Sequence, residues 1–108
     1  MANAYEVLGQ TTDAASGTAL VTVPSSTEVI VSTLVVCNRA ASAKTFRIYV
    51  RPDDETLADK HYIAYDTAIA ANDIVTLTLG ITMNASDKLY VYGSDANLSF
   101  NAFGTKIT

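Results

Sequence analysis

Residues 28–38 read EVIVSTLVVCN, a largely apolar run rich in the β-branched residues that suit a pleated strand. A strand places successive side chains on opposite faces, so this run has two predicted faces. One face carries Val29, Val31, Thr33, Val35 and Cys37, and the other carries Ile30, Ser32, Leu34 and Val36. Because both faces are mostly apolar, we expect a central strand that is covered on both sides, or a strand with one face against another chain.

Hydrophobic alternation with a period of two extends from this run in both directions along the chain. It predicts further strands at residues 4–10, 18–23, 45–51, 61–65, 75–79, 88–92 and 98–103. The side chains that we expect to face the core are Phe46, Ile48, Val75, Leu77, Leu79, Leu89, Val91 and Phe100.

Segments rich in Gly, Asn, Asp, Ser and Pro separate these runs, at residues 13–17, 24–26, 40–42, 72–73, 84–87 and 93–95. This spacing is typical of all-β sandwiches and barrels. Acidic residues follow a proline at residues 52–55, so we expect the segment 52–60 to be a loop with one helical turn. The sequence therefore predicts one all-β domain over residues 1–108, an antiparallel β-sandwich of seven or eight strands. Its strand order is either that of a jelly roll or immunoglobulin-like.

The charge of the chain limits the partners that it can bind. Charged residues make up 17% of the sequence, the net charge is −4, and the seven Lys and Arg residues are scattered. We therefore expect no nucleic-acid partner. No apolar run approaches the ~20 residues of a membrane-spanning helix, and the N-terminus lacks the basic and apolar regions of a signal peptide. We expect no membrane partner and synthesis in a cytoplasm. The single cysteine, Cys37, is expected to be a small buried hydrophobe.

The sequence offers few groups for catalysis or metal binding. His61 is the only histidine, and the neighbouring acids Asp59 and Asp66 do not converge with it along a straight strand. We expect His61 to lie at a strand edge, where its replacement has only a small surface effect. The acidic run at residues 53–55 lacks the glycine-spaced ligands of a calcium loop. We therefore predict no catalytic residue, no cofactor and no metal, and a protein that is not an enzyme.

Five of the six tyrosines are the candidate interaction residues. Tyr49, Tyr90 and Tyr92 fall on the polar phase of their strands, and Tyr62 and Tyr65 flank the irregular segment. Rigid amphipathic rings on the outward faces of a lightly charged domain are typical of protein contacts. The alternative is that these rings only cover the outside of one sheet.

Several blocks of sequence resemble a family of small virion proteins of tailed bacteriophages. The resemblance starts at residues 5–10 (YEVLGQ) and extends over nearly the whole chain. Its other blocks are residues 36–39 (VCNR), 45–51 (TFRIYVR), 60–66 (KHYIAYD), 69–73 (IAAND), 77–81 (LTLGI) and 99–104 (SFNAFG). The chain departs from the family pattern at the acidic residues 53–55, where we would expect a more neutral loop. The resemblance implies a structural component of the virion, made in the host cytoplasm.

Three functions fit these observations. The first is a capsid decoration or cement protein, a homotrimer or similar ring that contacts the major capsid protein. The second is a component of the tail, neck or baseplate, or the attachment domain of a fibre. The third is a carbohydrate-binding module, because β-sandwiches often bind glycans through exposed aromatic rings; the absence of Trp counts against it.

Overall fold

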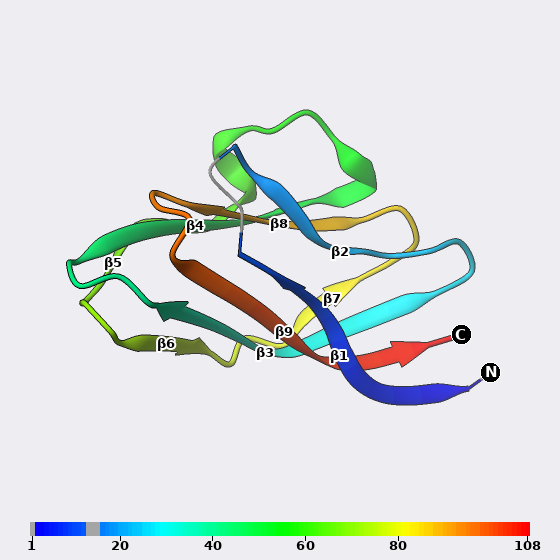
Figure 1. Cartoon of the computed structure of the whole chain (residues 1–108). Coiled ribbons are helices and arrows are strands. Elements are labelled where there is room, and N and C mark those ends of the chain that lie inside the picture. The colour runs from blue at the N-terminus through cyan, green and yellow to red at the C-terminus, as the bar shows by residue number, and fades with distance from the viewer. Residues whose placement is uncertain (1, 13–15) are drawn as a thin grey trace.

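Strands make up most of the computed structural model, which describes residues 2–12 and 16–108 (Figure 1). Residues 13–15 of the first expected turn lie outside the described residues. Within the described ranges there are nine strands. They are β1 (Asn3–Thr11), β2 (Thr18–Thr22), β3 (Glu28–Asn38), β4 (Lys44–Arg51), β5 (Tyr62–Ile69), β6 (Ile74–Leu77), β7 (Ile81–Met83), β8 (Lys88–Gly93) and β9 (Leu98–Ile107).

The strands form two antiparallel sheets that pack face to face, which confirms the predicted β-sandwich. The first sheet has the order β1-β9-β3-β6, with β7 also paired to β3, and the second has the order β2-β8-β4-β5. Strands β6 and β7 pair with opposite ends of β3, so they occupy one position in the sheet. The short strand β7 is not among the strands that the sequence predicts.

This strand order is that of a jelly roll. Successive strands β1, β2, β3 and β4 alternate between the two sheets, and the first and last strands pair side by side. An immunoglobulin-like sandwich instead keeps its first two strands in one sheet. Of the two orders that the sequence left open, the structure therefore has the eight-position jelly roll.

The core lies between the sheets and contains most of the side chains predicted for it. Phe46, Ile48, Leu89, Val91 and Phe100 are fully buried. The predicted Val75 and Leu77 are only half-buried and pack against this cluster from β6. The prediction for Leu79 is wrong, because β6 ends at Leu77 and Leu79 is exposed in the loop before Gly80.

The two predicted faces of β3 are wrong beyond its midpoint. The pairing with β9 shifts by one residue between Val31 and Thr33, as in a β-bulge. Before the shift, Val29 and Val31 face the core. After it the alternation is reversed, and Leu34 and Val36 face the core. Thr33, Val35 and Cys37 therefore face outward, and Cys37 is half-buried rather than part of the core.

The segment between β4 and β5 contains two short 3-10 turns, η1 (Pro52–Asp54) and η2 (Asp59–His61). Both Asp53 and Asp54 have φ of 55°, which a regular helix does not allow. The expected helical turn is therefore only a 3-10 turn at each end of a loop. Figure 1 shows this loop projecting beyond the sheet that contains β4 and β8.

Candidate functional site

The structure brings all five predicted tyrosines together on the outer face of the β2-β8-β4-β5 sheet. The ring of Tyr49 stacks on Tyr90 with centroids 5.2 Å apart, and lies 5.3 Å from Tyr62 at a tilt. Tyr62 in turn meets Tyr65 edge-on at 4.8 Å. These distances are those of favourable aromatic pairs. Pairing of β4 with both β5 and β8 places the rings side by side.

Two arginines lie among these rings. The Arg47 guanidinium lies between two tyrosines, 4.2 Å from the Tyr65 centroid and 4.9 Å from that of Tyr92. It also donates two hydrogen bonds to the Asp66 carboxylate, at 2.6 and 3.2 Å. This bidentate pair raises the pKa of Arg47 and lowers the pKa of Asp66. Arg51 lies 4.7 Å from the Tyr90 centroid and donates to the backbone carbonyl oxygen of Glu55 at 2.6 Å, so both guanidinium groups are engaged within the chain.

The aromatic cluster is largely covered, which limits what it can offer to a partner. Tyr49 is only 7% exposed, because its neighbouring rings and Gly17 lie over it, and burial raises its pKa. The sequence predicted an outward-facing Tyr49 ring that a partner could contact, but the ring has little exposed area in the structure. The rings of Tyr62, Tyr90 and Tyr92 are half-buried. Tyr65 alone among the five is well exposed, at 58%.

His61 has a structural position that the sequence did not predict. It is 6% exposed, so the expectation of a strand-edge surface residue is wrong. Its Nδ1 accepts a hydrogen bond from the backbone N–H of Ala58 at 3.0 Å, and its Nε2 lies 3.2 Å from Glu55 Oε1. An accepting Nδ1 leaves the ring proton on Nε2, which therefore donates to Glu55. This bond lowers the pKa of Glu55.

The residues nearest to His61 in sequence do not form a metal site with it. Asp66 is paired with Arg47 instead. In the described ranges, no three His, Cys, Asp or Glu side chains are grouped so that they could hold a metal ion. His61 and Glu55 instead connect η2 to the rest of the loop.

A second surface, on the outer face of the β1-β9-β3-β6 sheet, carries exposed apolar side chains among uncharged polar ones and was only partly predicted from the sequence. Cross-strand partners share a face, so pairing shows that Tyr5 and Val7 on β1 point the same way as Thr105 and Phe103 on β9. Tyr5 is 85% exposed, and Val7, Phe103 and Ile30 are also exposed. The second apolar face of residues 28–38 was the signal for this surface in the sequence.

Charge is nearly absent from this outer face. The outward residues are Asn3, Tyr5, Val7, Gln10, Glu28, Ile30, Thr33, Val35, Cys37, Ile74, Thr76, Thr82, Ser99, Asn101, Phe103, Thr105 and Ile107. Among these described residues Glu28 is the one with a charge, and the Arg39 guanidinium reaches the same face, where its Nε donates to Ser99 Oγ at 3.0 Å. The opposite sheet, by contrast, carries Arg47 and Arg51 among its rings.

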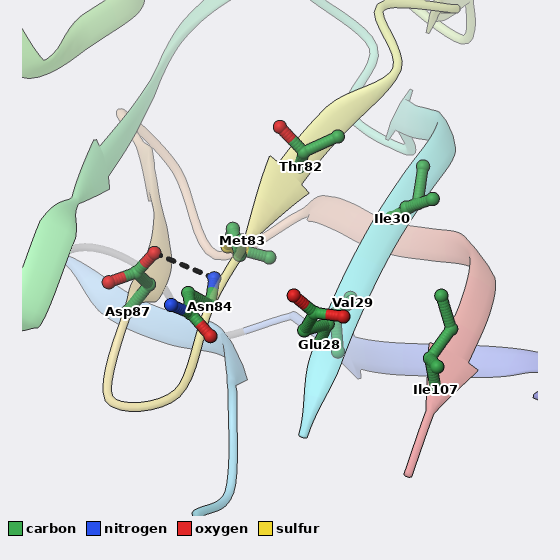
Figure 2. A pocket seen from close by; sticks show the side chains of 8 residues that line it. All are labelled: Glu28, Val29, Ile30, Thr82, Met83, Asn84, Asp87 and Ile107. Carbon is green, nitrogen blue, oxygen red and sulfur yellow. Dashed lines mark hydrogen bonds between the residues drawn. The ribbon is translucent and has the colours of Figure 1, made fainter. Parts of the chain in front are cut away.

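A shallow hollow of about 360 Å³ lies at one end of the apolar face (Figure 2). Val29, Ile30, Met83 and Ile107 supply its apolar lining. Glu28 lies on the same side as Ile107, while Asn84 and Asp87 come from the β7–β8 turn across the hollow. Asp87 is already engaged there, because its carboxylate accepts hydrogen bonds from the backbone N–H groups of Asn84 and Asp53.

No protein-family model, no curated protein and no solved structure matches this chain. None of the described residues belongs to a helix that is long and apolar enough to cross a membrane.

Proposed function

We propose that this protein is a non-enzymatic structural component of a tailed-phage virion that acts through protein–protein contacts. The observation that supports this most is the exposed, nearly uncharged outer face of the β1-β9-β3-β6 sheet. Contiguous exposed apolar surface on a small protein is typical of an interaction site. Depletion of charge and enrichment in aromatic side chains are typical of the centre of an interface.

The arrangement of the titratable groups supports a structural role over an enzymatic one. Arg47 and Asp66 neutralise each other within the aromatic cluster. His61 accepts a hydrogen bond from the backbone N–H of Ala58 and donates one to the Glu55 carboxylate, both within its own loop. A general acid or base needs a free position within reach of a substrate, and these groups are committed to internal contacts.

Within the virion, we propose decoration of the capsid shell, through contacts with copies of itself and with the major capsid protein. The chain is short and compact, with extents of 45 × 28 × 20 Å, and forms one sandwich. Such a shape suits a protein seated on a preformed surface. Jelly rolls recur in viral capsid domains, although this is an analogy of fold. The virion assignment rests on the sequence resemblance, and a place in the tail, neck, baseplate or fibre is the alternative.

A carbohydrate-binding role has less support from the aromatic cluster. A sugar needs an open ring face on which to stack, and Tyr65 is the exposed candidate. Arg47 lies over that ring at 4.2 Å and occupies one face of it. The other four rings are half-buried or buried.

The copy number of the protein in purified particles tests this proposal. Quantitative mass spectrometry against the major capsid protein should find hundreds of copies per particle for a decoration protein. A few copies to a few dozen would support the tail or neck alternative and overturn decoration. Absence from purified particles would overturn the virion assignment itself.

A further inference from the structure

A protruding side chain and a hollow lie in the same row of the apolar face. Tyr5 on β1 pairs with Thr105 on β9, Thr105 pairs with Ile30 on β3, and Ile30 pairs with Thr82 on β7. Tyr5 is the most exposed large apolar side chain among the described residues, and Ile30 and Thr82 line the hollow. Adjacent strands lie about 4.8 Å apart. Tyr5 and Ile30, which lies at the rim of the hollow, are therefore one strand spacing away from β9 on opposite sides, and the rest of the hollow extends from Ile30 toward β7.

This spacing makes the face complementary to a second copy of itself. A two-fold axis that lies in the contact plane and runs along β9 exchanges the positions of β1 and β3 between two facing copies. Tyr5 of each copy then meets Ile30 and the hollow of the other. In the next row, Val7 faces the position of Thr33, and Phe103 on β9 faces its own equivalent. Such self-matching is the requirement for a two-fold interface between identical chains.

The hollow also offers a polar partner for the tyrosine hydroxyl. Glu28 lines the hollow. Among the described residues its carboxylate takes part in no hydrogen bond or ion pair. A phenol that enters the hollow can donate to this carboxylate while its ring packs against Ile30 and Ile107. A buried tyrosine hydroxyl usually needs such a partner.

The size and charge of the face fit a second copy of this chain. With molecular extents of 45 × 28 × 20 Å, the broad face measures on the order of 1,000 Å², and a stable interface needs roughly 800 Å² from each partner. Two copies each carry a net charge of −4 and repel each other at most surfaces. Glu28 and the Arg39 guanidinium at Ser99 carry opposite charges, so this face has no net charge and is where two such chains can approach with the least repulsion.

We infer that two copies of this protein pack face to face through the outer face of the β1-β9-β3-β6 sheet, with Tyr5 of each copy seated in the hollow of the other. This inference deepens the proposed function, on which it rests for its biological setting. The contact yields a two-fold pair. A homotrimer of the kind expected from the sequence would need a different contact.

Oligomeric state in solution tests the inference with a matched control. The full chain should be a dimer by sedimentation equilibrium across micromolar concentrations, and Tyr5→Ala should weaken the dimer at least tenfold. Tyr65→Ala, which removes an exposed tyrosine from the opposite sheet, should leave the dissociation constant unchanged. A monomeric wild type at 100 µM, or equal effects of the two variants, would overturn the inference.

Cross-linking tests the position of the two-fold axis. Thr105 lies on β9 and should face its own equivalent, whereas Thr76 lies on β6 away from the axis. Facing sheets lie about 10 Å apart, too far for a disulfide but within reach of a short bis-maleimide. In a Cys37→Ser background, T105C should be linked into covalent dimers and T76C should not. The reverse result, or a defined trimer, would overturn the two-fold arrangement.

The outcomes for this inference and for the proposed function are separable. A dimer that is absent from phage particles would leave the inference standing and remove the virion assignment. A monomer present in hundreds of copies per particle would overturn the inference and leave the virion assignment standing. Because the interface is apolar, its dissociation constant should change less than threefold between 0.05 and 0.5 M NaCl; dissociation by salt would overturn the apolar account of the contact.

Discussion

The side-chain amide of Asn38 donates a hydrogen bond to the backbone carbonyl oxygen of Ile69, 31 residues away, at 3.3 Å. The same nitrogen lies within hydrogen-bond distance of the carbonyl oxygens of Ser42 and Ala70, and its Oδ1 accepts from the N–H of Ala40. Asn38 is fully buried at the end of β3. It thereby joins the turn after β3 to the turn after β5, where the chain crosses between the two sheets.

Replacement of Asn38 by Ala should lower the free energy of unfolding by about 2–3 kcal/mol, because buried backbone groups lose their partner. Asn101→Ala is the matched control, since Asn101 lies on the outer face and its side chain bonds only the Gln10 side chain among the described residues. The control should change stability by less than about 0.5 kcal/mol. Urea denaturation followed by circular dichroism measures both values. Equal effects would contradict a structural role for the Asn38 network.

Phe100→Ala should lower the free energy of unfolding by about 3–5 kcal/mol, because a fully buried aromatic ring leaves a cavity between the sheets. Phe103→Ala, three residues along the same strand, removes the same ring from the exposed outer face. In dilute protein it should cost less than about 1 kcal/mol. An unchanged denaturation midpoint for Phe100→Ala would contradict the inward assignment of this strand.

His61→Ala should be destabilising by about 1–3 kcal/mol, in contrast to the small surface effect expected from the sequence. The substitution leaves the Ala58 N–H without its acceptor in a part-buried position. Asp59→Ala, in the same 3-10 turn but exposed, is the control and should have little effect. Thermal denaturation measures both variants. A melting temperature for His61→Ala equal to that of the wild type would show that the ring is not required.

Acid should destabilise the protein through three carboxylates. The pKa of Asp66 is lowered by its hydrogen bonds with Arg47, that of Asp95 chiefly by the backbone N–H of Asn97, and that of Glu55 chiefly by His61. A carboxylate with a lowered folded pKa stabilises the fold above its unfolded value, here 3.8 for Asp and 4.5 for Glu. That stabilisation is lost as the pH falls through the folded pKa.

The melting temperature should therefore vary little with these groups above pH 5 and fall below about pH 4. A variant with Asp66→Asn and Asp95→Asn should have a lower melting temperature at pH 7, and that temperature should fall less steeply as the pH is lowered. Asp59→Asn, which removes a carboxylate without an ion-pair partner among the described residues, should keep the wild-type slope. Parallel acid profiles for all three proteins would contradict this linkage.

The sequence by itself determined the class of fold and most of the core. Alternation with a period of two identified eight of the strands, because a half-buried strand must place its apolar residues on one side. It also found Phe46, Ile48, Leu89, Val91 and Phe100, which all belong to strands with regular alternation. The same rule placed Tyr49, Tyr90 and Tyr92 on the outward phase of their strands, but only the tertiary structure made these strands neighbours and brought Tyr62 and Tyr65 to them.

Only the tertiary structure decided the strand order, the faces of β3 and the role of His61. A jelly roll and an immunoglobulin-like sandwich use the same local patterns and differ in which distant strands pair, as β1 does with β9. The bulge between Val31 and Thr33 inverts the alternation although nothing within residues 28–38 marks it, because the register is set by the partner strand, where Gly104 lies at the bulge. The hollow forms where β3, β7 and β9 meet. Strand order, register and the hollow depend on contacts between segments that are far apart in the chain. His61 instead bonds Ala58 and Glu55 of its own loop, which has no repeating pattern. Local periodicity encodes neither kind of feature.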